Sequence, residues 1–385
     1  MPTRKLKTID LFSGCGGAAL GLSDQCKVIA YCEYDKDCQS VLQNNQDLGY
    51  LDKAPIHPDV RTFPKLKQKV DLVSAGFPCQ DISIAGNQHG LKGERSSLFH
   101  DAMKVVKNHK PPYVFLENVS NILRMPKVWK PVLKSLDKAG YDASWMILAA
   151  SNLGAPHKRK RWFLLGTKRG SEKPFNKRVS GAKLFGGGSG RWNSKGWPKN
   201  SSRKWDIGVP RMINSDDTHA TRQRLCQCGN ICVPQQADAA FSILRNGVDW
   251  PTHGRAQPIS FRESQMPKWG QMVDGELYEV TPHDIPEGSS LNLKFKQYKR
   301  PSGRGRGKAQ LPTLHKEVTR DRYTTPRAHG GNSPAGTLTR RAIQDISNQL
   351  RFEKNTPTSH RWKHYPNPEY IEWMVGLPRG WTKLQ

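Results

Sequence analysis

One cysteine of the chain stands where a catalytic nucleophile would be expected. Cys79 follows the apolar run 70–75 closely, within the sequence Phe77-Pro78-Cys79-Gln80. The ring of Pro78 restricts the backbone directly before the thiol. A cysteine is usually a small buried apolar side chain. The side chains that surround Cys79 in the fold therefore decide whether its thiol is only packed in the core or is reactive.

Charged side chains follow other apolar runs of the same region. Glu117 and Asn118 end the run that starts at Tyr113, and Arg159 and Arg161 lead into another run. Because ligand sites of open α/β sheets lie at the carboxyl ends of the strands, we expect these groups to converge near Cys79. Cationic neighbours lower the pKa of a thiol and favour the nucleophilic thiolate. The arrangement therefore favours covalent catalysis by Cys79.

A glycine-rich turn is predicted near the N-terminus. The segment 10–17 reads Asp-Leu-Phe-Ser-Gly-Cys-Gly-Gly, an apolar strand that runs into glycines. Glycine permits positive φ and close backbone approach to a ligand. Gly14, Gly16 and Ala19 fit the dinucleotide fingerprint, and Glu33 follows 19 residues after Gly14, a spacing suited to ribose hydroxyls. Alone, this pattern fits a nicotinamide cofactor, S-adenosylmethionine or a tight turn without a ligand.

Strand and helix patterns alternate through the first 166 residues. Strands are predicted at Thr8–Phe12, Lys27–Tyr31, Val70–Ala75, Tyr113–Leu116, Trp145–Ala150 and Arg161–Gly166, with helices at Ser97–Asn108 and Val128–Ala139 among the segments between them. Strands separated by helices predict an α/β fold with a doubly wound parallel sheet.

The charge of the chain indicates a polyanionic partner. Lys and Arg number 61 against 33 Asp and Glu, a formal net charge of +28. The range 155–211 holds 16 basic and two acidic residues, and 294–327 holds 11 and two. Neutralising phosphates with such charge releases counterions, so nucleic acid is the expected partner. The run Gly303–Gly307, with Arg304 and Arg306, is expected to be a phosphate-contacting loop.

Other classes of protein do not fit. No apolar stretch approaches the ~18 residues of a membrane helix, and no signal peptide precedes the first strand. The eight cysteines are therefore expected to be free thiols. Cys226, Cys228 and Cys232, with His219, lack the spacing of paired zinc ligands, and no metal is expected.

The ordered motifs resemble those of the DNA (cytosine-5)-methyltransferases. The matching segments cover 8–166 in the family order. They are the segment 10–17, Glu33, Asp59-Val60, Gly76-Phe77-Pro78-Cys79-Gln80 with Ser83, Arg95 to Phe99, Glu117-Asn118-Val119 and Arg159-x-Arg161.

The resemblance implies a fold and a reaction. The fold is a Rossmann-like doubly wound sheet of the S-adenosylmethionine-dependent methyltransferase type, with a smaller, irregular, basic target-recognition domain. The reaction is sequence-specific methylation of cytosine in double-stranded DNA, on a base flipped out of the duplex. Cys79 attacks carbon 6, Glu117 hydrogen-bonds the ring nitrogen and amino edge, and Arg159 and Arg161 position the base. The methyl group passes from S-adenosylmethionine to carbon 5.

The resemblance also assigns binding residues. Those matching the cofactor positions of the family are Phe12, Gly14, Gly16, Gly17, Glu33, Tyr34, Asp59, Val60, Pro78, Leu98 and Asn230. Those expected to contact nucleic acid are Gln80, Ser83, Asn118, Arg304 and Arg306.

The chain departs from the family pattern in its second half. His157 stands where the family usually has Gln, and Ala85 where many relatives have Ser. The segment 228–237 resembles the last family motif and 368–381 the penultimate one, so their order is reversed. The expected division is a catalytic and cofactor-binding domain over 1–167, a basic linker over 168–221, a cofactor-side helix over 222–245, a target-recognition domain over 246–365 and a linking segment over 366–385.

Three alternatives remain beside this interpretation. A transfer-RNA cytosine-5 methyltransferase would use the same machinery, a catalytically inactive relative would only bind DNA, and a nicotinamide-dependent dehydrogenase would have no use for Pro78-Cys79-Gln80. For the leading interpretation we expect a monomer in the cytoplasm of a prokaryotic or virus-infected cell. The enzyme would belong to a restriction–modification system or to a virus.

Overall fold

A computed structural model of the chain describes residues 4–78, 98–153, 155, 157, 159–171, 212–214, 218–246, 257–279 and 364–383. Cys79, Gln80, Ser83, Arg304 and Arg306, which the sequence singles out, lie outside these ranges.

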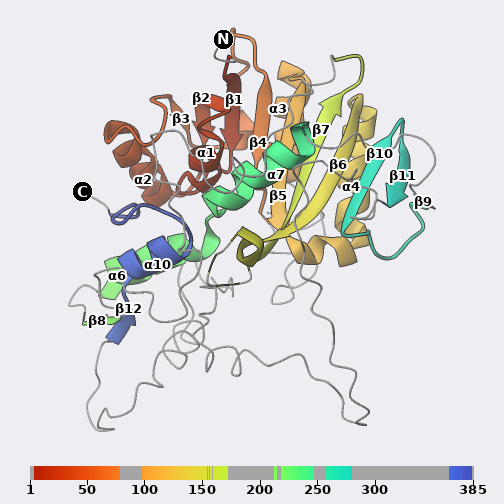
Figure 1. The fold of residues 1–385 in the computed structure, drawn as a ribbon. Helices are drawn as coiled ribbons and strands as arrows, with labels where there is room; N and C mark the ends of the chain where they lie inside the picture. Colours follow the sequence, from red (N-terminus) through yellow and green to blue (C-terminus); the bar gives the residue numbers. More distant parts are fainter. Residues whose placement is uncertain are drawn as a thin grey trace, which may run out of the picture.

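Within the described ranges, the centre of the molecule is a ten-stranded sheet in the order β3-β2-β1-β4-β5-β7-β6-β10-β11-β9 (Figure 1). Its strands are β1 (Leu6–Leu11), β2 (Cys26–Cys32), β3 (Ile56–His57), β4 (Leu72–Ala75), β5 (Tyr113–Val119), β6 (Tyr141–Ala149), β7 (Lys160–Lys168), β9 (Gln257–Ile259), β10 (Trp269–Val273) and β11 (Glu276–Glu279). All the strands predicted in the first 166 residues are present, with ends shifted by a few residues.

The sheet is mixed, and the prediction of an all-parallel sheet is wrong at β7. Strands β1 to β5 pair in parallel, whereas β7 is antiparallel to both β5 and β6. The reason is the short connection between Ala149 and Lys160. A parallel pair needs a crossover of a dozen or more residues, usually with a helix, so the chain turns back beside β6.

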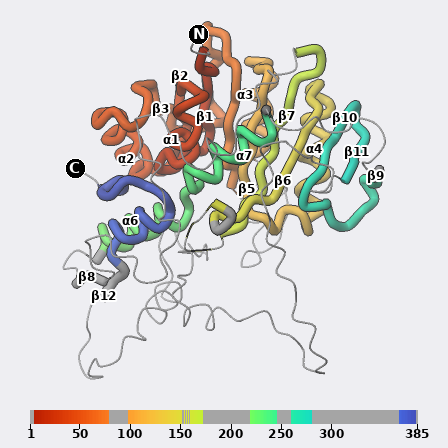
Figure 2. The backbone as a smooth tube through the Cα atoms, in the orientation of Figure 1, coloured from red at the N-terminus to blue at the C-terminus, as the bar shows by residue number. Residues whose placement is uncertain are grey.

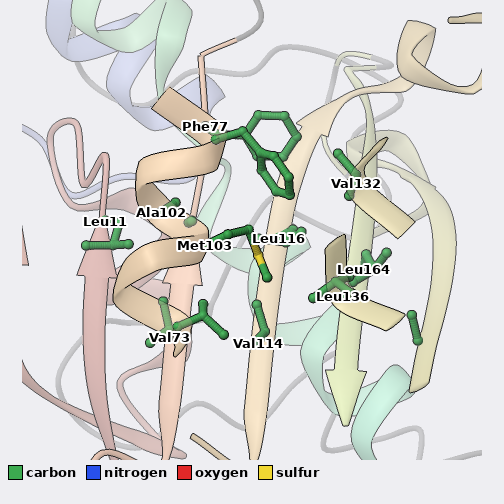
Figure 3. Packing of buried hydrophobic residues seen from close by; sticks show 14 of the residues in the cluster. Leu11, Val73, Phe77, Ala102, Met103, Val114, Leu116, Val132, Leu136 and Leu164 are labelled. Atoms are coloured by element: carbon green, nitrogen blue, oxygen red, sulfur yellow. The ribbon is translucent and has the colours of Figure 1, made fainter. Parts of the chain in front are cut away.

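Helices cover both faces of the sheet, as the doubly wound prediction requires. The helices in the described residues are α1 (Gly17–Leu22), α2 (Lys36–Asp47), α3 (Leu98–His109), α4 (Pro126–Lys138), α6 (Thr218–Asn230), α7 (Pro234–Asn246) and α10 (Pro368–Met374), of which α6 and α10 lie beyond the end of the sheet (Figure 1). On one face, Met103 of α3 and Leu136 of α4 pack with Val114 and Leu164 of the strands (Figure 3). On the other face, the ring of Phe241 in α7 lies edge-on to Phe115, with centroids 5.2 Å apart.

Part of the range assigned to target recognition belongs to the catalytic sheet. Strand β10 pairs antiparallel with β6, and β11 and β9 extend this edge. A Cβ on Gly270 would come within 2.7 Å of Cε2 of Trp145, so glycine lets the β10 backbone lie on that ring. The predicted boundary at residue 246 therefore does not separate 257–279 from the first domain, and the rest of 246–365 is outside the described residues.

The C-terminal segment lies beside elements that are distant in the sequence. Helix α10 lies beside α6, near the end of the molecule that carries α2 (Figure 2). Strand β8 (Met212–Asn214) pairs with β12 (His364–Pro366) in a small second sheet. None of the helices in the described part of the chain is long and apolar enough to cross a membrane.

Candidate active site

The glycine turn and Glu33 form one hydrogen-bonded unit after β1 and β2. Phe12 and Gly14 have φ of 55° and 54°, which turns the chain sharply after the strand. The Gly14 amide donates to Oε2 of Glu33 at 2.7 Å, and the Asp35 amide donates to Oε1 at 2.8 Å. Burial raises the pKa of Glu33 above its usual value, although these amides oppose the shift. The carboxylate is thus fixed in position beside the turn.

A cavity of about 230 Å³ opens between this turn, the carboxyl ends of β4 and β5, and helix α6. Its lining includes four of the predicted site residues, namely Phe12, Gly14, Glu117 and Asn230. Asp10, Ser74 and Gly76 from β1, β4 and the residue after β4 also line it. The predicted cofactor turn and the predicted catalytic carboxylate therefore share one cavity.

Other residues assigned to the cofactor lie outside this lining, and Glu33 is one of them, although it accepts from the amide of Gly14, which lines the cavity. Tyr34 is 75% exposed, and Asp59 pairs with Arg61 at 2.6 Å. Val60 is buried, Leu98 begins α3, and Pro78 is the last described residue before Cys79.

Gly16 and Gly17, which the sequence assigned to the cofactor, do not line the cavity and lie instead against neighbouring protein atoms. A Cβ on Gly17 would overlap the carbonyl oxygen of Cys232 and lie 2.5 Å from Cγ1 of Ile231. A Cβ on Gly16 would lie 2.7 Å from Cδ1 of Leu51. In this structure Gly17 serves the approach of α1 to the chain between α6 and α7.

Glu117 lies near the end of β5 and faces the segment that leads to Cys79. Its Oε1 forms an ion pair with Nε of Arg161 at 3.0 Å. A Cβ built on Gly76 would lie 3.4 Å from Oε2, so this oxygen faces the backbone three residues before Cys79. Burial raises the pKa of Glu117, whereas Arg161 and Arg159 lower it. The carboxyl group can thus hold a proton more readily than an exposed one.

Arg159 and Arg161 have different surroundings. Arg161 holds Glu117, as described above. Arg159 is 5% exposed and donates through Nη2 to the carbonyl oxygens of Gly229 at 3.0 Å and Ile231 at 2.5 Å. Burial lowers the pKa of Arg159 to about 9. The structure therefore places Arg159 at the end of α6.

Asn118 is buried and anchors the approach to Cys79. Its Nδ2 donates to the carbonyl oxygen of Phe77 at 3.1 Å, and its Oδ1 accepts from the Val119 amide at 2.8 Å. The sequence assigned this residue to nucleic-acid contact. In the structure this side chain hydrogen-bonds the backbone two residues before Cys79, and the nucleic-acid contact stays a prediction.

His157 and Gln236 tie the C-terminal elements to this region. His157 Nε2 lies 2.8 Å from the carbonyl oxygen of Met374, and burial lowers the pKa of His157 to about 3. Gln236 Nε2 donates to the carbonyl oxygens of Leu148 at 2.9 Å and Arg159 at 2.8 Å. The sequence analysis did not single out Gln236. Its position in the segment that resembles the last family motif was the one signal that could have identified it.

A second missed group holds the C-terminal segment against the turn. Glu372 is fully buried and accepts from Nη2 of Arg224 at 2.9 Å and from the amides of Gly380 at 2.6 Å and Thr382 at 2.9 Å. Trp381 Nε1 donates to the carbonyl oxygen of Cys15 at 2.7 Å. The penultimate-motif segment thus supports the glycine turn from outside the cavity. In the described residues, no cluster of three or more His, Cys, Asp or Glu side chains is arranged to hold a metal ion.

Comparison with known proteins identifies the family. Residues 6–223, more than half of the chain, match the family described as C-5 cytosine-specific DNA methylase. The type II methyltransferase M.CviJI of Paramecium bursaria Chlorella virus IL3A is 28% identical over 362 residues, covering 90% of each chain.

Two bacterial relatives are also similar. The type II methyltransferase M.Sau3AI of Staphylococcus aureus is 26% identical over 424 residues, covering 98% of this chain and 89% of the relative. M.DsaV of Dactylococcopsis salina is 33% identical over 177 residues, but the match spans 43% of this chain and 47% of that relative. With the cavity and its carboxylate in place, the family match shows that the chain belongs to the C-5 cytosine-specific DNA methylases and is a DNA (cytosine-5)-methyltransferase.

Proposed function

We propose that the chain methylates cytosine within a specific double-stranded DNA sequence, with Cys79 as the nucleophile and S-adenosylmethionine as the methyl donor. The observation that carries this proposal is the shared cavity. It joins the turn held by Glu33 to Glu117, and Oε2 of Glu117 faces the backbone that leads to Cys79.

The residues present fit the proposed cofactor. Glu33 is fixed beside the turn, where a carboxylate can accept hydrogen bonds from ribose hydroxyls through its remaining lone pairs. Asn230, at the last position of α6, presents an amide to the same cavity. Phe12 and Gly14 shape the turn. When bound, S-adenosylmethionine supplies the electrophilic methyl group.

The catalytic steps follow from the charged groups near β5. The Cys79 thiolate attacks carbon 6 of a cytosine that has been flipped out of the duplex. Negative charge then develops in the ring, and Glu117 stabilises it by hydrogen bonding to the ring nitrogen. Arg161 fixes the orientation of Glu117, and burial raises the pKa of that carboxyl above its usual value. Loss of the carbon 5 proton after methylation releases Cys79 as a thiolate.

The test is bisulfite sequencing of a plasmid after expression of the protein in a host without cytosine methylation. We expect cytosines in one short sequence context to resist conversion. Cys79→Ser should abolish this protection, and Cys26→Ala, which removes a thiol of β2 that does not line the cavity, should retain it. Unprotected plasmid together with methyl transfer to tRNA would contradict DNA as the substrate, and protection by Cys79→Ser would contradict the assignment of the nucleophile.

A further inference from the structure

We propose that a basic surface outside the cavity binds the phosphate backbone of duplex DNA beside the target cytosine, without reading its bases. The surface is formed by the 3-10 helix η3 (Ser120–Arg124), helix α4 and the loop between β9 and β10. We call it the basic surface, and its residues are Arg124, Lys127, Lys130, Lys134 and Arg262. The inference rests on the proposed function, because the duplex named there is the partner.

Three of these cations lie in a row along α4. Lys127, Lys130 and Lys134 are three and four residues apart, so they share one face of the helix. Lys127 and Lys134 are exposed and Lys130 is half-buried, while Val132 and Leu136 on the other face pack toward the sheet (Figure 3). The row is about 10 Å long. This length can face about three successive phosphates of one strand, which lie 3.4 Å apart along the duplex axis.

The loop between β9 and β10 adds a further cation to this face. The amide of Met266 donates to the carbonyl oxygen of Leu123 at 2.8 Å. The ring of Phe261 stacks on Trp129 of α4, with centroids 6.2 Å apart. Both contacts hold the exposed Arg262 against η3 and α4. A segment that the sequence assigned to target recognition therefore completes a surface of the first domain.

Aromatic rings, rather than carboxylates, hold two of the ammonium groups. Nζ of Lys130 lies 5.3 Å from the centroid of the Trp129 ring, and Nζ of Lys134 lies 5.7 Å from that of Phe261. A ring face attracts a cation without neutralising its charge. The two positive charges thus stay available to a phosphate group.

The carboxylates nearby leave the basic surface with a large excess of positive charge. Among the described residues, no Asp or Glu forms an ion pair with any of its five cations. Asp137, the one acidic residue of α4, pairs with Arg169 at 2.6 Å. Glu263 is exposed in the loop beside Arg262. Five cations against this one exposed carboxylate favour a polyanion over a protein surface of mixed charge.

The basic surface begins at the end of the sheet that carries the candidate active site. Glu117 lies two residues before the end of β5 at Val119, and η3 follows directly. Arg124, the last residue of η3, is therefore about 10 Å beyond the strand. Helix α4 lies on the side of β6 and β10, away from α2 (Figure 1). A duplex whose cytosine reaches Glu117 thus has a flanking stretch of backbone within reach of these cations.

The experiment measures how salt weakens the binding of duplex DNA. Fluorescence anisotropy follows the full chain on a labelled duplex of about 30 base pairs between about 50 and 200 mM salt. The variant combines Lys127→Gln, Lys130→Gln and Lys134→Gln, and glutamine keeps a similar helix propensity. We expect the slope of log K against log salt to become less steep by about 2–3, and Kd at 100 mM salt to rise at least about 10-fold.

A matched control removes the same charge from the opposite end of the strands. Lys65, Lys67 and Lys69 are exposed and precede β4, which runs parallel to β5. Their triple replacement by Gln should change the slope by less than about 0.5. Arg262→Gln tests the loop alone and should reduce the slope by about 1. Melting temperatures establish that each variant is folded.

The outcomes separate the basic surface from the proposed function. Failure of the unmodified protein to bind duplex DNA at any salt concentration would overturn both. An unchanged slope in the folded α4 variant, or an equal loss in the control variant, would overturn the basic surface alone. Loss of affinity for tRNA without loss of affinity for the duplex would overturn it as well. A reduced slope in the α4 variant, when the unmodified protein leaves plasmid cytosines unmethylated, would support the surface and contradict the proposed function.

Discussion

Gly17→Ala offers a direct test of how α1 is positioned. In an ordinary helix interior this change stabilises a protein by about 1 kcal/mol, because alanine has the higher helix propensity. Gly17, however, lies against the chain between α6 and α7. An added Cβ would lie 2.5 Å from Cγ1 of Ile231 and would overlap the carbonyl oxygen of Cys232. We therefore expect the sign of the effect to be reversed.

The magnitude follows from the movement that the methyl group would require. Carbon atoms pack at about 3.5–4.0 Å, so α1 and the junction must separate by about 1 Å. Pivoting of the helix does not relieve the overlap, because a Cβ on Gly21 would lie 2.8 Å from the carbonyl carbon of Pro234. Overpacking of this kind costs about 1–3 kcal/mol and exceeds that range where backbone must move. We expect a net loss of about 2–3 kcal/mol, which corresponds to a fall in Tm of about 3–4 °C for a chain of 385 residues.

The assay is thermal unfolding of the full chain without cofactor, followed by circular dichroism. Ser40→Ala, at an exposed position of α2, is the control and should leave Tm within about 1 °C, because alanine is well tolerated in helices. A Gly17→Ala protein as stable as the unmodified chain would refute the packing argument. An unchanged Tm combined with weaker S-adenosylmethionine binding would return Gly17 to the cofactor site.

Three further predictions concern groups that the structure buries. Glu372→Ala leaves Arg224 without its carboxylate partner and should lower the free energy of unfolding by about 3–5 kcal/mol in urea titrations. Equal stability would contradict a supporting role for this pair. Burial raises the pKa of Asp238 to about 7, so this carboxyl destabilises the folded state progressively as pH rises from about 4 to 7, and fully above 7. Asp238→Asn should therefore stabilise the protein by about 2 kcal/mol at pH 8, and the difference should vanish as pH falls from 7 towards 4. A pH-independent difference in unfolding free energy would be inconsistent with this titration. Asn118→Ala removes the hydrogen bond to the carbonyl oxygen of Phe77 and should lower kcat about 10–100-fold, with unchanged affinity for S-adenosylmethionine. An unchanged rate of methylation would argue that Asn118 does not position the segment leading to Cys79.

The catalytic half was accessible from the sequence because its signals are local. Strand and helix periodicity, together with turn residues, predicted β1, β2, β4, β5, β6, β7, α3 and α4 within a few residues of their ends. Segment 10–17 predicted the turn, and the positions of Glu33 and Glu117 after strands predicted the edge of the sheet at which they lie. Each of these inferences needs only neighbours along the chain and the rule that places sites at strand ends.

The direction of β7 and the addition of β10, β11 and β9 to the sheet could not be predicted from local sequence patterns. The antiparallel placement of β7 depends on the length of a connection, and that of β10 depends on the fit of Gly270 against Trp145. Neither is a property of hydrophobic pattern. The segment 257–279 lacks the long apolar runs of a central strand, since β11 and β9 lie at the edge of the sheet.

The sequence by itself determined the family, the candidate catalytic set and the turn, because residue types at fixed spacing encode them. Tertiary structure alone decided what each buried polar side chain contacts. It brought Arg159 to the end of α6, Asn118 to Phe77, and Gly17 to the junction before α7. These partners lie far apart in the sequence, and a hydrogen bond or a close packing contact depends on positions fixed to within an ångström, which only the assembled layers of the fold provide.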